Sequence, residues 1–244
     1  VNIDNTSDYK NREQQEWEPD YGLSSHFIYK ENINAFYFNS RIAHYKFVLE
    51  AGLRIENTNI KGQLPGNRLQ ADSSFSKSYI NLFPSVTLSY QAGKNHSLNL
   101  SYRRRIDRPN YQDMNPFVYI FDTYTYEQGN TTLQPQFSDN LELSYLLANN
   151  YKVAVFYNQT NDVIAKYFIL SENSKRVYVM PKNLATYRSC GIRLSAGNLS
   201  PVKYMQSTAR IGLTHNQYEW SLIQDANKTA QTTLMFHVGN RFLL

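Results

Sequence analysis

Long hydrophobic runs are missing from this sequence of 244 residues. No stretch approaches the ~18 consecutive apolar residues that a membrane-spanning helix needs, so a helical membrane protein is excluded. The same absence leaves open a protein that crosses a membrane with strands, because such strands alternate in polarity and stay polar on average. A mean hydropathy of -0.56 and a hydrophobic content of 41% therefore do not separate a soluble chain from a strand-built membrane protein.

Cysteine, glycine and proline are also scarce. The single Cys190 cannot form an internal disulfide, and there is no thiol cluster that could hold a metal. With 10 Gly and 8 Pro, the composition argues against a fibrous or disordered chain. The histidines follow no metal-binding spacing, so we expect neither a metal site nor a cofactor. They are His26, His44, His96, His215 and His237.

Positive charge is in excess but is not concentrated. The net charge is +5 and the pI is near 9.1, yet the only tight basic cluster is Arg103, Arg104 and Arg105. A nucleic-acid-binding surface needs lysine and arginine gathered along one face. We therefore expect no nucleic-acid partner.

Alternation of apolar and polar residues dominates the sequence. Leu98, Leu100 and Tyr102 alternate with serine, asparagine and arginine, and several other segments repeat this pattern. Successive side chains of a strand point to opposite faces, so each segment has one apolar and one polar face. The pattern predicts nine strands, at 24–40, 43–56, 78–91, 96–106, 137–148, 151–160, 177–198, 202–217 and 229–244.

The connections between these strands alternate in length. They are short near Ile42 and at 92–95, 149–150 and 200–201, and long at 57–77, 107–136, 161–176 and 218–228. Tight turns at one rim and long loops at the other are typical of outer-membrane barrels, with the turns periplasmic and the loops outside. Most segments also reach the ~9–11 residues that a tilted strand needs to cross a bilayer. The sequence therefore predicts an all-β, antiparallel up-and-down transmembrane β-barrel.

Tyrosine and phenylalanine are abundant, with 20 and 13 residues. Tyr45, Tyr90 and Tyr151 flank short turns on the apolar face of their strands, which favours a girdle at the membrane–water interface. The alternative is that tyrosine simply prefers strands. Tyr204 also flanks a short turn but has the wrong parity, so it either needs a bulge or breaks the pattern.

Nine strands is an odd number, whereas a self-contained bacterial barrel has an even one. We therefore expect residues 1–244 to be part of a single, larger barrel domain. Residues 1–22 are polar and would be the remnant of an extracellular loop.

The stretch Ser101–Phe117, SYRRRIDRPNYQDMNPF, resembles a signature of the outer-membrane β-barrel family of TonB-dependent receptor type. Thr131 departs from the pattern, since the family often has proline there. The likeness covers roughly 25–200. Further stretches that carry it are Gly52–Glu56, Tyr126–Asn130, Leu133–Pro135, Asn140–Tyr145, Asn161–Ile164 and Lys182–Leu184.

The resemblance implies a receptor in the cell outer membrane that imports a scarce nutrient, such as a metal chelate, a glycan or a peptide. It implies a barrel of about 22 strands around an N-terminal plug domain of the same protein. The implied partners are outer-membrane lipid, this plug, an inner-membrane energising complex and, as a further candidate, a surface lipoprotein. The alternatives are a non-transport barrel for adhesion or assembly, and a small complete passive pore.

Ligand contacts are predicted at the outer mouth. Arg103 and Arg105 fall on the polar, lumenal face, while Arg108 and Pro109 break the strand and let the following loop fold inward. Tyr111 and Asn115 lie in that loop, and these two residues with Arg103, Arg105 and Arg108 are the candidate ligand-binding residues. The alternative is that the stretch serves loop architecture alone.

Mixed charge on the lumenal face predicts ion pairs between strands around a water-filled or plugged interior. The predicted lumenal charges are Glu50, Arg54, Glu56, Arg103, Arg105, Glu142, Lys152, Arg193 and Arg210.

No catalytic residues are predicted. There is no Gly-rich phosphate cradle. A barrel lipase would need Ser and His on adjacent strands facing lipid, and His215 has that parity, but many residues share it by chance. We therefore expect this protein not to be an enzyme.

Overall fold

The computed structural model describes residues 1–244 except 14–15, 70, 172–174, 203, 223–224 and 243–244. Nine long strands dominate the described chain and follow one another in sequence order. They are β4 (Ser25–His44), β5 (Phe47–Leu64), β6 (Ser73–Gly93), β7 (His96–Asp107), β10 (Gln136–Leu147), β11 (Tyr151–Ser171), β12 (Arg176–Val202), β13 (Met205–Leu222) and β14 (Asp225–Phe242).

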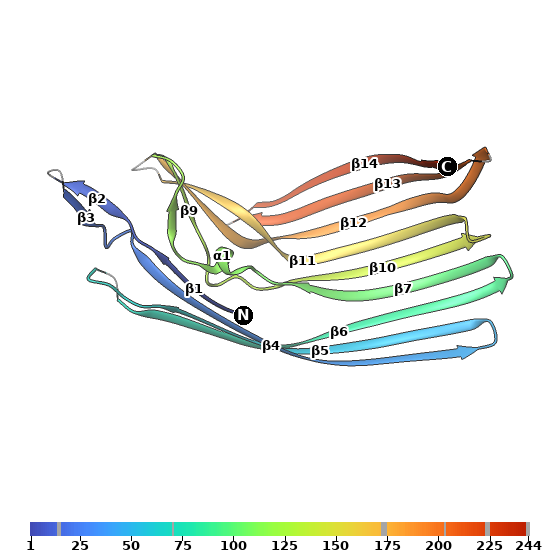
Figure 1. The fold of residues 1–244 in the computed structure, drawn as a ribbon, viewed down its shortest axis with the longest axis horizontal. Coiled ribbons are helices and arrows are strands. Elements are labelled where there is room, and N and C mark those ends of the chain that lie inside the picture. Colours follow the sequence, from blue (N-terminus) through green and yellow to red (C-terminus); the bar gives the residue numbers. More distant parts are fainter. Residues whose placement is uncertain (14–15, 70, 172–174, 203, 223–224, 243–244) are drawn as a thin grey trace.

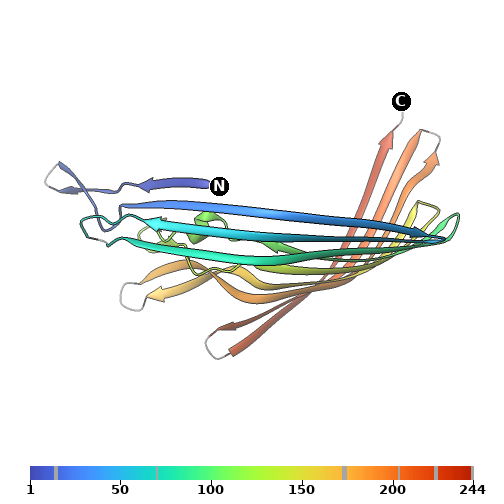
Figure 2. The ribbon, with the colours of Figure 1, turned by 90° about the horizontal axis from the view of Figure 1, so that it is seen from below.

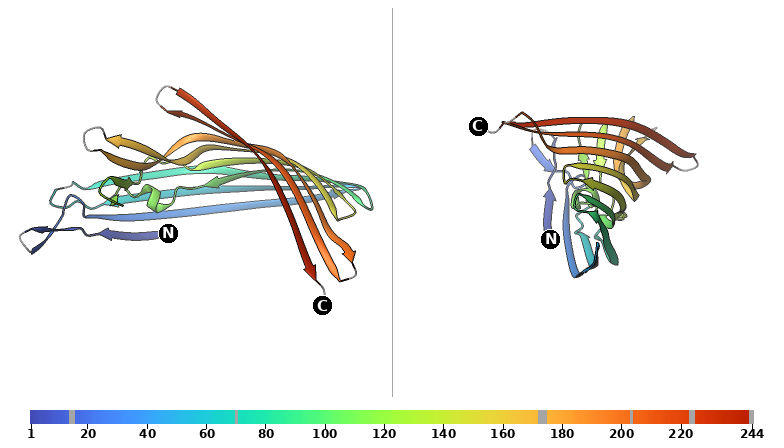
Figure 3. Two further views of the ribbon diagram at one scale, coloured as in Figure 1. Left: turned by 90° about the horizontal axis from the view of Figure 1, so that it is seen from above. Right: turned by 90° about the vertical axis from the view of Figure 1, so that its right-hand side faces the viewer.

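These strands form one antiparallel, strongly curled sheet in the order β4-β5-β6-β7-β10-β11-β12-β13-β14. Each long strand pairs with the next one along the chain, which is the up-and-down connectivity of a barrel wall (Figure 1). Seen end on, the sheet curves into a half-barrel (Figure 3). The predicted fold class is confirmed.

Short elements gather at one end of the sheet. β1 (Asn2–Ser7) pairs with β4, and β2 (Lys10–Glu13) forms a hairpin with β3 (Glu16–Pro19). Between β7 and β10 lie α1 (Tyr111–Met114), β8 (Val118–Ile120) and β9 (Thr125–Gln128). Within the described residues, no helix is long and apolar enough to span a membrane. Figure 2 shows α1 toward the end opposite to the short turns, and we call that end the mouth.

Several predicted connections are wrong in position or length. The first turn lies at Tyr45 and Lys46 rather than near Ile42, with Tyr45 at a φ of 50°. β12 runs through 200–201 to Val202, so the turn predicted there belongs to the strand backbone. Tyr204 stands in the turn before β13 and not in a strand, so its side chain has no strand parity.

The long connections are mostly extensions of the strands. β5 continues to Leu64, β11 to Ser171 and β13 to Leu222, so the loops predicted at 57–77, 161–176 and 218–228 are largely paired backbone. Beyond the apolar region, as in 57–64 of β5, the outward positions are polar and the inward ones include Ile60 and Leu64, so the alternation reverses its phase and no longer continues the pattern of the preceding residues. Only 108–135 is a long connection in the described structure.

The register aligns the apolar faces of all nine long strands. One row of paired positions crosses the whole sheet, and every side chain in it is at least 37% exposed. The row is Ile42, Leu49, Leu88, Leu100, Leu143, Val155, Ile192, Leu213 and Leu234. A continuous exposed apolar face of this extent is not stable in water and marks a surface that contacts lipid or protein.

Aromatic rings lie near the short turns of this face. Tyr90 stacks on Phe47 with ring centroids 4.7 Å apart, and Tyr151 is 47% exposed. Tyr45, in the first turn, is 95% exposed beside His44. The girdle at this rim stays a prediction, since the same rings would also suit strands.

Candidate functional site: the lumenal face and the mouth loop

The face opposite to the apolar rows is polar and carries ion pairs between neighbouring strands. Arg41 on β4 lies 3.5 Å from Glu50 on β5, while Arg54 and Glu56 form a pair within β5 at 3.2 Å. Glu142 accepts from Lys152 at 2.9 Å and from Arg193 at 2.6 Å, which links β10, β11 and β12. The register places the predicted charged residues on this lumenal face, and these contacts hold adjacent strands together.

The mouth loop, residues 108–135, packs onto the lumenal face of the sheet. Met114, Phe117 and Leu133 of the loop form a core with residues of β4 and β5, and each of the three is at most 4% exposed. Burying one such side chain stabilises the docked loop by about 1.5–3 kcal/mol. The wall residues of this core are Phe27, Tyr29 and Ile60. The inward fold predicted for the loop is confirmed.

Arg108 anchors the start of the loop. Its guanidinium donates to Glu56 on β5, which is 5% exposed, and to the Thr58 hydroxyl at 3.1 Å. Burial opposes the charge, but the hydrogen bond and negative charge of Glu56 raise the pKa of Arg108 above its ordinary value. Arg108 thus neutralises a carboxylate that the wall buries.

Asn115 organises the interior of the loop. Its side chain is fully buried, accepts from the Phe117 N–H at 3.2 Å and donates to the Tyr119 hydroxyl at 3.0 Å. Its carbonyl accepts from the Gly129 N–H at 3.0 Å. A Cβ on Gly129 would lie 2.3 Å from that carbonyl oxygen, so only glycine fits there. This requirement could not be predicted from the local sequence, because it arises from contact between two distant parts of the loop.

The other end of the loop is fixed to β12. Asn183 accepts from the Gln134 N–H and donates to the Gln134 carbonyl, both at 2.8 Å. Asn130 donates to the Pro181 carbonyl at 3.0 Å, and β9 pairs in parallel with Val177–Val179. The loop therefore spans the concave side of the sheet, from the β4–β6 wall to the β11–β12 wall (Figure 1).

The remaining candidates lie where the sequence predicted but differ in exposure. Arg103 and Arg105 are exposed on the lumenal face, where they line a hollow of about 260 Å³ together with Arg54. Tyr111 is half-buried against the loop core. Arg104 points to the outer face, with its guanidinium 5.3 Å from the centre of the Phe137 ring. The ligand-binding roles of all five candidates stay predictions.

A second hollow, of about 420 Å³, opens on the mouth loop. Asp113, Tyr119 and Phe121 line it, and so do Glu127 and Lys166, whose charged atoms are 2.6 Å apart. Burial raises the pKa of the Asp113 carboxyl, and burial likewise raises the pKa of the Tyr119 hydroxyl. This hollow therefore has aromatic surface and both signs of charge in its lining.

The described part of the chain contains no group of three His, Cys, Asp or Glu side chains placed to hold a metal ion. His215 lies on the outer face, where its Nδ1 is 2.9 Å from the Thr232 hydroxyl. His26 pairs with Asp4 near the mouth at 2.5 Å, and Cys190 is exposed.

Comparison with known proteins agrees with this geometry. The model of the outer membrane protein beta-barrel family matches residues 1–244. No curated protein matches this chain. The siderophore receptor PirA from Pseudomonas aeruginosa is similar in structure, with a TM-score of 0.52 and 13% identity over 89% of this chain and 50% of that one.

Two other solved structures are similar. A variant of the ferric enterobactin receptor PfeA from Pseudomonas aeruginosa has a TM-score of 0.50 and 12% identity, over 99% of this chain and 50% of that one. The siderophore receptor PiuA from Acinetobacter baumannii has a TM-score of 0.50 and 9% identity, over 93% of this chain and 38% of that one. The chain thus spans about half the length of PirA and PfeA, and less than half that of PiuA. At these identities the likeness concerns the fold.

Proposed function

This chain belongs to the outer membrane protein beta-barrel family, and from that premise we propose that it forms part of a TonB-dependent-type receptor that imports a scarce nutrient. Its place is the cell outer membrane, where the apolar rows face lipid and the polar face lines the lumen. The cargo class we propose is a metal chelate, a glycan or a peptide.

The mouth loop is the observation that carries this proposal. It is held to one wall by a buried ion pair and an apolar core, and to the other wall by hydrogen bonds and strand pairing. A loop fixed across the lumen narrows the entrance and leaves Arg103 and Arg105 facing the space below it. This arrangement suits capture of a ligand at the mouth followed by controlled entry.

The partners follow from the same proposal. The lumenal wall carries Arg103, Arg105 and Arg210, which suit contact with a plug domain of the same protein, and transport would need an inner-membrane energising complex. A surface lipoprotein would deliver or hold the cargo. We also propose that residues 1–244 form part of a single barrel domain, with 1–22 on its extracellular side. We propose no catalytic step and no cofactor.

Energy-dependent uptake tests the proposal. A strain that lacks the gene and the same strain complemented with it are supplied with ferric chelates, glycans or peptides as the limiting nutrient, with and without a protonophore. We expect only the complemented strain to take up one of these classes, and the protonophore to abolish that uptake. Uptake that the protonophore leaves intact would favour a passive pore. No uptake difference on any nutrient would favour adhesion or assembly.

A further inference from the structure

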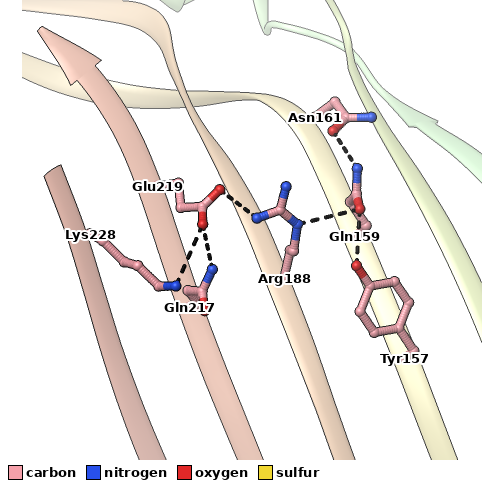
Figure 4. Close-up of polar contacts among 7 residues, drawn as sticks. All are labelled: Tyr157, Gln159, Asn161, Arg188, Gln217, Glu219 and Lys228. Carbon is pink, nitrogen blue, oxygen red and sulfur yellow. Dashed lines mark hydrogen bonds and ion pairs between the residues drawn. The ribbon is translucent and has the colours of Figure 1, made fainter. Parts of the chain in front are cut away.

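A polar network lies on the outer wall of the half-barrel, on the face that meets the membrane. It spans four neighbouring strands, β11 to β14 (Figure 4). The network consists of Tyr157, Gln159, Asn161, Arg188, Gln217, Glu219 and Lys228. None of these side chains belongs to the lumenal wall or to the mouth loop.

Register places this network on the outer face. Tyr157, Gln159 and Asn161 have the same strand parity as Val155, which belongs to the exposed apolar row. Gln159 pairs with Arg188, and Arg188 pairs with Gln217. Each network residue is therefore displaced from the apolar rows along its strand toward the mouth. In an outer-membrane barrel the mouth side is extracellular, so the network lies at the headgroup level of the outer leaflet.

Hydrogen bonds hold the network together. Gln159 accepts from the Tyr157 hydroxyl at 3.0 Å and from Arg188 Nε at 3.5 Å, and donates to Asn161 at 3.0 Å. Glu219 accepts from Arg188 Nη1 and, at 2.6 Å, from the Gln217 amide. These bonds link side chains of β11, β12 and β13 into one connected group.

The charge of the network favours an anionic ligand. Arg188 and Lys228 share the single carboxylate of Glu219, and the Lys228 ammonium is 3.7 Å from it. The group therefore keeps one net positive charge. A guanidinium presents its N–H groups in a planar fork that matches the oxygens of a phosphate. The side-chain amides of Gln159, Asn161 and Gln217 add donors and acceptors of the kind that bind sugar hydroxyls.

We propose that this network binds the headgroup of a phosphorylated glycolipid of the outer leaflet. The phosphate contacts Arg188 and Lys228, the sugar contacts the amide side chains, and the acyl chains lie on the apolar rows below, beside Val155 and Ile192. Cationic side chains beside an apolar membrane surface attract anionic headgroups. The proposal rests on the membrane location of the barrel and is independent of what the barrel transports.

Lipid binding to the full-length protein in detergent micelles tests this proposal. The probe is a fluorescent, phosphorylated lipid A, and the test variant combines Arg188→Gln with Lys228→Gln. The control is Arg193→Gln, because Arg193 lies on the same strand as Arg188 but faces the lumen. Heat-modifiable migration in gels shows that each variant is folded. We expect the double variant to bind roughly tenfold more weakly or worse, and the control to bind like the native protein.

Three outcomes would overturn the proposal. The double variant could bind the probe as tightly as the native protein, which would remove the network from the site. Dephosphorylated lipid A could bind equally well, which would remove the phosphate contact. Phosphatidylglycerol could displace the probe as effectively as unlabelled lipid A, which would replace a glycolipid site with a general anionic surface.

Discussion

Arg108 ties the start of the mouth loop to the wall through its charge. Its partner Glu56 is buried on β5 and has Arg54 as a second cation at 3.2 Å. Replacing Arg108 with alanine leaves the buried Glu56 carboxylate with only one of its two cationic partners, Arg54. A hydrogen bond to a charged group contributes about 1.5–3 kcal/mol. We expect Arg108→Ala to weaken docking of the loop by that amount. Hydrogen–deuterium exchange of residues 108–135 measures it.

Arg105→Ala is the matched control, because Arg105 is exposed on the same lumenal face. An exposed substitution of this kind changes stability by about 0.5 kcal/mol or less. Equal exchange in the two variants would show that the buried ion pair does not hold the loop.

Gly129 is a second residue on which the loop depends. A methyl group there would meet the Asn115 carbonyl oxygen at 2.3 Å, and backbone cannot move aside cheaply. Overpacking of this sort costs about 1–3 kcal/mol. We expect Gly129→Ala to speed amide exchange throughout the loop. Gly93→Ala is the control, since its nearest neighbour would be a His96 side-chain atom at 3.6 Å; similar exchange in both variants would contradict the contact.

Among the elements, the long strands were predictable and their ends were not. Within the membrane one face meets lipid and the other meets the lumen, so alternation marks residues such as Leu98 to Tyr102 clearly. Beyond the apolar rows the outward positions of 57–64 are polar and the inward ones include Ile60 and Leu64, so the alternation is reversed there and does not extend the strand before it. Hydrogen bonds between strands, which sequence does not display, continue the ladder there.

The mouth loop was likewise predictable only in part. The Arg108–Pro109 break and the resemblance around it predicted an inward loop, and the structure confirms that fold. The partners of the loop could not be predicted, because Glu56, Asn183 and Phe27 are far from it in sequence. Glu56 was recognised as lumenal by parity, yet parity alone does not say which cation reaches it.

Two lysine substitutions can test which face of a strand meets lipid and which meets the lumen. Leu100 and Ser101 are neighbours on β7, and Leu100 belongs to the exposed apolar row while Ser101 faces the lumen. A lysine on the lipid face near the membrane centre costs about 2–4 kcal/mol, whereas a lumenal lysine contacts water. We expect Leu100→Lys to lower the urea midpoint in liposomes far more than Ser101→Lys. Equal midpoints for the two variants would make the assignment of faces wrong.

At the scale of the whole molecule, one sheet serves two environments. Its outer face carries an apolar row across all nine long strands, and its inner face is charged and partly covered by the mouth loop. Every functional proposal made for this chain depends on that division. A ligand can contact Arg103 and Arg105 only if they line a lumen, and a glycolipid can contact Arg188 only if its face meets lipid.

The most direct test of this division is a spin-label scan of β7 in the full-length protein reconstituted into liposomes. Single cysteines are placed at each position from 97 to 102, in a Cys190→Ser background because Cys190 is exposed. Oxygen and a water-soluble nickel chelate then report contact with lipid and with water. We predict alternation with a period of two, with oxygen favoured at Leu98, Leu100 and Tyr102, and the chelate favoured at the positions between them. Uniform accessibility along the strand, or alternation of the opposite phase, would contradict a membrane-spanning barrel wall with this lumenal face.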